Sequence, residues 1–259
     1  MNVGASQRVS TRTLLITAAL LVAAVAFLPW PLAQRIADSP WSGPGDLAHG
    51  VADAFVIDHR HGTTPTAADA ALRPSTEFWR WFHLVKAVVA VPLVVVAGVL
   101  VPRLRARGAG SRMRRIGRAT ASGTAACVTL VGVVIVIANV QGAFAPLSSV
   151  LSFLPQVSGT EVAVAARAVR LDVSAASLAP STSALVHDFA VYHAVLAVAA
   201  TCLVIGCLVM AARLWRSRHR CDSAATGFVA VAFAVIAAAN LSTAFAPAPA
   251  FAAFLGGMG

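Results

Sequence analysis

Residues 83–101 read HLVKAVVAVPLVVVAGVLV, a run in which Lys86 is the only lysine, arginine or acid. A bilayer core of roughly 30 Å needs about 20 mostly apolar residues in a helix, so this run predicts a membrane span. Four further stretches have, or nearly have, the required length and composition: residues 13–28, 123–138, 189–212 and 224–239. None shows the alternation that the strands of a membrane barrel need. We therefore predict five transmembrane helices.

The composition of the whole chain is apolar as well. Of the 259 residues, 58% are apolar and only 12% are charged, and the mean hydropathy is +0.79. Soluble domains are nearer 45–50% apolar and about 25% charged. This contrast excludes an ordinary cytosolic enzyme, a disordered chain and a disulfide-stapled secreted domain. The fold class that remains is an all-α integral membrane protein.

The first apolar stretch, residues 13–28, has two interpretations. Arg8 and Arg12 precede it, and Ala24-Val25-Ala26 resembles a cleavage site, so it is compatible with a signal peptide. That site falls inside the apolar run, however, and the prolines of 29–31 suit an exit from the membrane. We expect a retained helix, with a cleaved signal peptide as the alternative.

Arginine placement predicts the orientation of the spans. Segments 1–12, 102–122 and 213–223 hold thirteen of the 20 basic residues and a single acid, Asp222. Basic loops stay in the cytoplasm, so we expect the N-terminus inside and, after five spans, the C-terminus outside. The preference for Arg over Lys, together with abundant Ala and Val, suggests a high-GC bacterium and hence a plasma membrane.

The same basic segments predict the partners of the inner face. Anionic lipid head groups will meet them in any membrane. Nucleic-acid binding is not expected, although the net charge is +10, because apolar runs separate the basic residues and 102–122 has no interleaved aromatic residue. A membrane-protein partner or a second copy of the chain remains possible.

Two parts of the chain resemble each other. Residues 138–147 read ANVQGAFAPL and residues 239–248 read ANLSTAFAPA, and each follows an apolar stretch and an Arg-rich loop. Upstream, Phe82-His83 stands where Tyr192-His193 stands. Chance similarity of Ala-rich helices is the alternative, but the matched Asn, Phe and Pro favour a duplicated two-helix unit.

Two spans per unit make the repeats parallel, related by an axis along the membrane normal. We therefore expect helices 2–3 and 4–5 to form a pseudo-twofold four-helix bundle with the N-terminal helix appended. The predicted organisation is an N-terminal helix or signal anchor at 1–30, an outer segment at 31–78, a first hairpin at 79–155, an outer segment at 156–187 and a second hairpin at 188–259. Within the outer segments, residues 47–57 and 161–171 suit short interfacial helices, and 180–183 suit a turn.

Four polar or helix-stopping positions recur near the outer ends of the spans. Pro146 and Pro247 are natural helix stops because proline lacks the backbone donor. Asn139 and Asn240 are expected to hydrogen-bond across helices, which favours bundle stabilisation over ligand binding.

The matched histidines are the candidate cofactor-binding residues. If the repeat axis runs through the bundle, His83 and His193 lie at one depth, where two imidazoles could ligate a haem or share one transition metal. Two interfacial histidines without a ligand are the alternative. Lys86, one turn from His83, either forms an ion pair with Asp188, or extends to the outer interface, or belongs to a site.

A second candidate site is a metal site on the outer face. His59 and His61, two apart, and His187 with Asp188 supply imidazole and carboxylate, the ligand set of zinc, copper or non-haem iron. Their spacing matches none of the established metal signatures.

We therefore expect a polytopic bacterial plasma-membrane protein that is a non-enzymatic accessory subunit or small transporter with a His/Asp-rich outer face. The alternative is a metal- or haem-binding membrane oxidoreductase centred on His83 and His193. Catalytic residues are not indicated.

Overall fold

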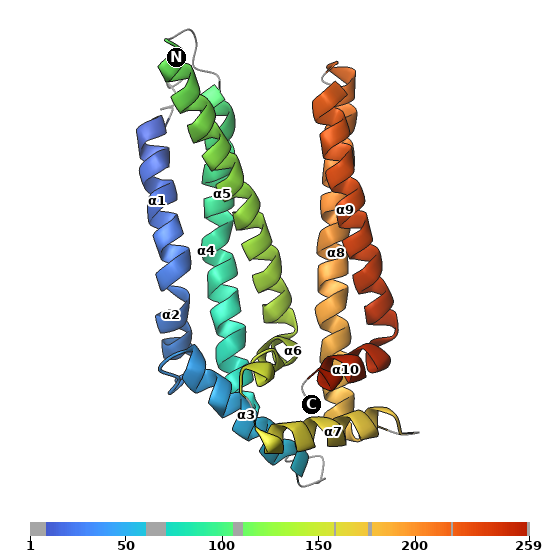
Figure 1. Cartoon of the computed structure of the whole chain (residues 1–259). Helices are drawn as coiled ribbons and strands as arrows, with labels where there is room; N and C mark the ends of the chain where they lie inside the picture. The colour runs from blue at the N-terminus through green and yellow to red at the C-terminus, as the bar shows by residue number, and fades with distance from the viewer. Residues whose placement is uncertain are drawn as a thin grey trace, which may run out of the picture. The chain divides into compact units, whose positions relative to one another are not determined.

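A computed structural model describes residues 9–60, 71–105, 111–157, 159–175, 178–218 and 220–257. These residues form helices and connecting turns, without a strand in the described ranges (Figure 1). In chain order the helices are α1 (Thr11–Phe27), α2 (Pro29–Ile36), α3 (Pro44–Arg60), α4 (Arg73–Arg105), α5 (Arg112–Phe144), α6 (Pro146–Leu151), the 3₁₀ helix η1 (Leu154–Gln156), α7 (Thr160–Val173), α8 (Pro180–Arg216), α9 (Arg220–Phe245) and α10 (Pro247–Gly256).

Four of these helices, α4, α5, α8 and α9, are long and apolar enough to cross a membrane. Helices α1 and α2 meet at a bend of 51° and pass the same test together, which makes a fifth span if the bent pair is counted as one. Each of the five predicted stretches lies mainly in one of these helices. The prediction of an all-α protein with four to five membrane-spanning helices is therefore confirmed by length and composition.

The spanning helices begin earlier and end later than their apolar stretches. The clearest difference is at residues 180–183, where the prediction of a turn was wrong: α8 begins at Pro180 and continues to Arg216. Proline is favoured at the first helical position, because the backbone donor it lacks would have no partner there. Consequently His187 and Asp188 lie inside α8 instead of in a connection.

The described chain divides into two compact units. The first contains Met1–Ala33 and Phe82–Asn139, that is α1 with most of α4 and α5. Val25 of α1 is buried against Ala90 and Leu93 of α4, and partly buried apolar side chains of α1 and α5 surround this cluster. Helix α1 thus supplies part of the core of this unit, and its retention over cleavage as a signal peptide stays a prediction.

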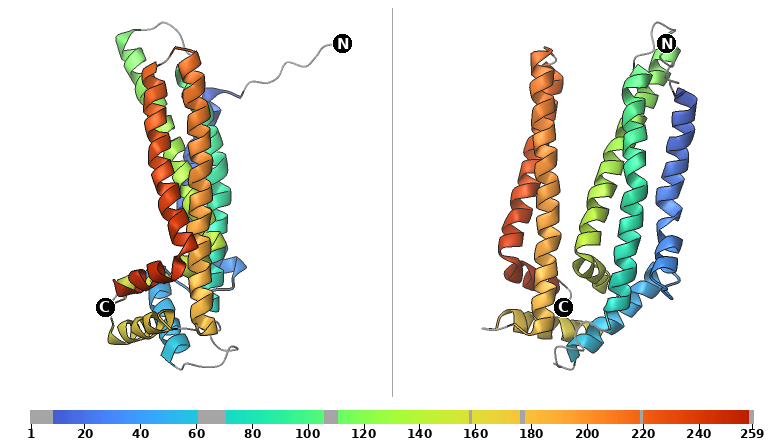
Figure 2. Two further views of the ribbon diagram at one scale, coloured as in Figure 1. Left: turned by 90° about the vertical axis from the view of Figure 1, so that its right-hand side faces the viewer. Right: turned by 180° about the vertical axis from the view of Figure 1, so that it is seen from behind.

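The second unit contains Gln34–Trp81 and Val140–Gly259. Helices α8 and α9 lie side by side in every view (Figure 2), and small buried side chains, including Ala197, Ala200 and Ala230, let them approach closely. A compact apolar core forms from the shorter helices, where α7 contacts α3, α10 and α8. Its largest fully buried side chains include Phe55, Phe78, Phe251, Leu151, Leu154 and Leu255.

The outer segments form helices where amphipathic patterns predicted them. Residues 47–57 lie in α3 and residues 161–171 lie in α7. The buried side chains of α7 recur at helical spacing and face its neighbours: Val162, Ala165, Ala166 and Val169. The expectation of two short helices is confirmed.

Helix α5 ends at Phe144 and α9 ends at Phe245, each two residues before a proline, and a short helix follows each break. Ala145 precedes Pro146 with φ −127° and ψ 66°, and Ala246 precedes Pro247 with φ −128° and ψ 64°. The residue before a proline avoids helical dihedral angles, which explains why both helices end here. The prediction that both prolines stop a helix is confirmed.

Helices α4 and α5 pack closely at Gly132. A methyl group added there would lie 2.8 Å from Val94 Cγ2, whereas one added at Gly98 would lie 3.8 Å from Thr129 Cγ2, an ordinary contact. We expect Gly132→Ala to lower the free energy of unfolding by about 1–3 kcal/mol relative to Gly98→Ala, since overpacking displaces a branched side chain. Thermal unfolding in detergent measures the difference. Adding Val94→Ala should restore part of the loss, and equal melting temperatures for the two glycine variants would contradict this packing.

Candidate functional site

In the first unit, an interhelical hydrogen bond joins His83 of α4 to Asn139 of α5. His83 Nδ1 lies 2.8 Å from Asn139 Oδ1, and Asn139 Nδ2 donates to the backbone oxygen of Ile135 at 2.7 Å. Asn139 is 6% exposed. The asparagine therefore uses both ends of its amide, one along its own helix and one across the hairpin.

The second hairpin has the same arrangement. His193 Nδ1 of α8 lies 2.8 Å from Asn240 Oδ1 of α9, and Asn240 Nδ2 donates to the backbone oxygen of Ile236 at 2.8 Å. The prediction that both asparagines hydrogen-bond across helices is confirmed within each hairpin. Their partners are the two histidines that the sequence comparison matched.

The orientation of the asparagine amide decides which imidazole nitrogen carries the proton. In both pairs the amide nitrogen donates along its own helix, so the oxygen that faces the imidazole accepts. Nδ1 must therefore donate, and in the neutral ring the lone pair lies on Nε2. Metal-bound histidines are held in the same way, by a partner that accepts from the nitrogen not used for ligation. Both rings are thus held in the tautomer that carries its proton on Nδ1.

Aromatic side chains stand at matching positions beside the two pairs. The ring centroid of Phe82 lies 5.6 Å from that of His83, and Tyr192 lies 5.6 Å from His193. One turn before each histidine, a second aromatic residue contacts the segment that follows the proline. These contacts are Trp79 with Phe153, at a centroid distance of 4.9 Å, and Phe189 with Phe254, at 6.1 Å.

The two hairpins differ at Lys86. Its Nζ lies 5.1 Å from the centroid of the Phe82 ring, a cation–π distance, whereas the equivalent position of α8 is Leu196. The Asp188 carboxylate accepts a hydrogen bond from the backbone of Ser148 at 2.6 Å. An ion pair between Lys86 and Asp188 stays a prediction.

Only three of the four residues of the predicted outer metal site lie in the described part of the chain, so this site stays a prediction. His59 Nδ1 lies 2.9 Å from the backbone oxygen of Phe55, one turn earlier in α3, and Asp188 is bound to Ser148. His187 is exposed on α8, and His61 lies outside the described residues. Among the described residues, three or more His, Cys, Asp or Glu side chains do not come together in any metal-binding group.

Two connections between the end of α5, α6 and α8 were not predicted. Gln141 Nε2 donates to the backbone oxygen of Tyr192 at 3.0 Å, and Asp188 binds Ser148 as described above. Both contacts join segments distant in sequence. A single sequence does not indicate which distant residues form a hydrogen bond with each other. A polar residue next to an apolar span, such as Gln141, indicates only that a hydrogen-bond partner is needed there.

Comparison with known proteins gives no match to a family model, to a curated protein or to a solved structure.

Each histidine–asparagine pair should stabilise its own hairpin. We expect a double-mutant cycle of His83→Ala and Asn139→Ala to give a coupling energy of about 0.6–1.7 kcal/mol, the range of interhelical hydrogen bonds in membranes. The cycle of His193→Ala and Asn240→Ala should give a similar value because the geometry is the same. Equilibrium unfolding in mixed micelles measures both cycles. Additive single effects in either hairpin would contradict a hydrogen bond there.

Proposed function

We propose that the chain is an integral protein of a bacterial plasma membrane, crossing it five times with its N-terminus in the cytoplasm and its C-terminus outside. Support comes from the four or five helices of sufficient length and from the arginine-rich segments, which fall at alternate ends of those helices. In this topology the histidine–asparagine pairs lie toward the outer ends of the spans, and anionic lipids contact the inner arginines.

We further propose that the α4–α5 and α8–α9 hairpins are duplicated copies, arranged as a pseudo-twofold four-helix bundle with α1 appended. Three matched features support the duplication: the histidine–asparagine geometry, the backbone angles before the two prolines, and the aromatic contacts that follow them. Chance resemblance of Ala-rich helices does not account for matched contacts between non-alanine residues. The domain limits 1–30, 31–78, 79–155, 156–187 and 188–259 belong to this proposal.

The biochemical role that we favour is a non-enzymatic accessory subunit or small transporter. The observation that carries it is the small buried share of the second hairpin. In the most apolar 18-residue stretch of α8 only 11% is buried, and in that of α9 only 6% is buried. Such a hairpin offers most of its apolar surface to lipid, to the first hairpin of the proposed bundle, to another membrane protein or to a second copy of the chain.

A specific observation favours a second candidate function, a metal- or haem-binding oxidoreductase. The asparagines hold both imidazoles in the tautomer with the proton on Nδ1, the tautomer of histidines that bind iron or another transition metal through Nε2. His83 and His193 would then be the ligands, and the bound group would supply electron transfer. The aromatic residues that flank each histidine would line the site.

Absorption spectra and metal analysis of the detergent-purified chain distinguish the two roles. For the accessory or transport role we expect no Soret band and no stoichiometric metal, and a native mass that shows how many chains or partners associate with the 26.6 kDa chain. A band or metal that is lost in both His83→Ala and His193→Ala would replace the first proposal by the second. His49→Ala is the control, since it removes an exposed histidine of α3 that belongs to neither candidate site.

Labelling of single cysteines on the two sides of the membrane tests the proposed orientation of the chain. In a chain whose other cysteines are replaced by serine, native Cys221 should react with a membrane-impermeant maleimide only after cells are permeabilised, because it is exposed at the start of α9, in a basic segment proposed to be cytoplasmic. The thiol of a Ser174→Cys variant, at the end of α7, should react on intact cells. The reverse labelling would contradict the proposed orientation.

A further inference from the structure

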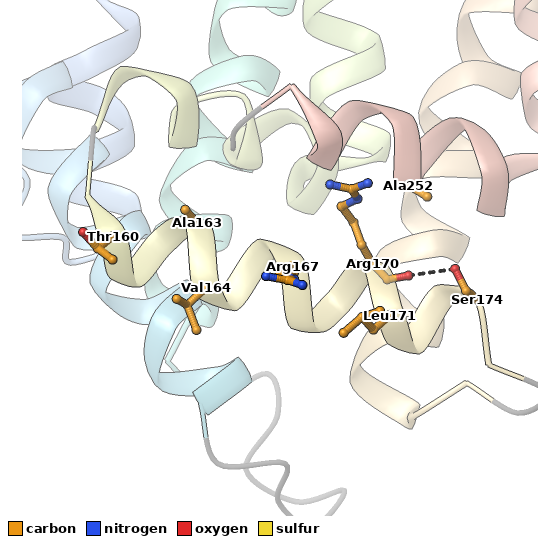
Figure 3. A pocket seen from close by; sticks show the side chains of 8 residues that line it. All are labelled: Thr160, Ala163, Val164, Arg167, Arg170, Leu171, Ser174 and Ala252. Carbon is orange, nitrogen blue, oxygen red and sulfur yellow. Dashed lines mark hydrogen bonds between the residues drawn. The ribbon is translucent and has the colours of Figure 1, made fainter.

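The outward side of α7 forms one wall of an open groove of about 670 Å³ that reaches α10 (Figure 3). Seven residues of α7 and its end line it together with Ala252 of α10. Its lining combines two arginines, Arg167 and Arg170, with apolar and small polar side chains. The groove lies apart from the histidine–asparagine pairs, and the proposed function leaves it unused.

The pattern of α7 explains why this face is open. Val162, Ala165, Ala166 and Val169 are buried against neighbouring helices. On another face, Val164, Arg167 and Leu171 follow one another at helical spacing, and Val164 and Leu171 are 60% and 66% exposed. Large apolar side chains on both sides of an arginine are typical of a surface that meets the boundary between head groups and acyl chains.

The two guanidinium groups are open to a ligand. Neither forms an ion pair with another residue in the part of the chain that the structure describes. Figure 3 shows the Arg170 side chain extending from α7 toward the helix of Ala252, and a methyl group added at Gly256 would lie 3.6 Å from its central carbon. The contact with α10 positions Arg170, while Arg167 stands exposed on α7. Guanidinium donors match the geometry of phosphate oxygens.

The position of the groove along the chain fixes its depth in a membrane. Helix α10 begins at Pro247, directly after the break that ends the spanning helix α9. Helix α7 contacts both α10 and α8. A groove between the end of one span and a helix packed on it lies at the level of the lipid head groups, where a phosphate and the upper part of an acyl chain are both within reach.

We propose that this groove binds the phosphate of an anionic phospholipid through Arg167 and Arg170, with an acyl chain along Val164, Leu171 and Ala252. The inference rests on the membrane part of the proposed function. It is separate from the arginine-rich segment 213–223, because that segment lies at the end of α8 and the start of α9, whereas α10 follows the end of α9. The outer groove is a shaped site, whereas the inner loops attract any anionic surface.

The test counts lipids bound to the full chain by native mass spectrometry in detergent, with phosphatidylglycerol and phosphatidylcholine of the same acyl chains. We expect the wild-type chain to retain one more phosphatidylglycerol than Arg167→Ala/Arg170→Ala, with at least a tenfold loss of affinity in the variant, and no such difference with phosphatidylcholine. Arg73→Ala/Arg80→Ala, which removes two exposed arginines of α4, should behave like the wild type. Ala252→Trp, which fills the groove and keeps every charge, should also lose the lipid.

Three outcomes would overturn the groove as a lipid site. The first is that the wild type and the Arg167→Ala/Arg170→Ala variant retain the same amount of phosphatidylglycerol. The second is that the Arg73→Ala/Arg80→Ala control loses as much phosphatidylglycerol as the groove variant, because the effect would then come from total charge and not from the groove. Displacement of the lipid by millimolar inorganic phosphate is the third, and it would indicate a site for a soluble anion. A chain that stays monodisperse without detergent would overturn the membrane proposal itself, so the two failures are distinguishable.

Discussion

A polar side chain inside an apolar span must find its partner within the protein, because lipid offers none. His83 and His193 meet this constraint with the same solution: an asparagine of the next helix accepts from Nδ1 while its amide nitrogen donates along its own helix. The arrangement has two consequences. It fixes the axial register of the two helices in each hairpin, and it fixes the tautomer of the imidazole.

The packing of the chain is divided between two kinds of contact. Along α8 and α9 the buried residues are small, as at Ala197, Ala200 and Ala230, so the helices approach closely but bury little apolar area. Large buried side chains such as Phe55, Phe251 and Leu255 gather instead in the shorter helices, which bury more apolar area per residue. Close van der Waals packing and hydrogen bonds act between α8 and α9.

The parts of the fold that depend on local composition could be predicted from the sequence. Run length and hydropathy gave the spanning helices, amphipathic spacing gave α3 and α7, and proline chemistry gave the ends of α5 and α9. The same chemistry was misapplied at Pro180, because a proline stops a helix that precedes it and suits the first position of one that follows. Contacts between distant segments were harder to predict from the sequence. The interhelical role of Asn139 could be predicted, but its partner His83 could not. The contacts of Gln141 with Tyr192 and of Asp188 with Ser148 were not predicted.

The break before Pro247 has a consequence for how the end of the chain is used. Residues 247–256 are apolar, and without the proline they would extend α9 by ten residues in the same direction. The change of direction at Ala246 turns them aside, so that Phe251 and Leu255 become buried beside α7 and α8 instead of facing lipid. Pro247 thus sets where α9 ends independently of hydropathy. The apolar residues that follow it belong to the core that α10 forms with α7 and α8.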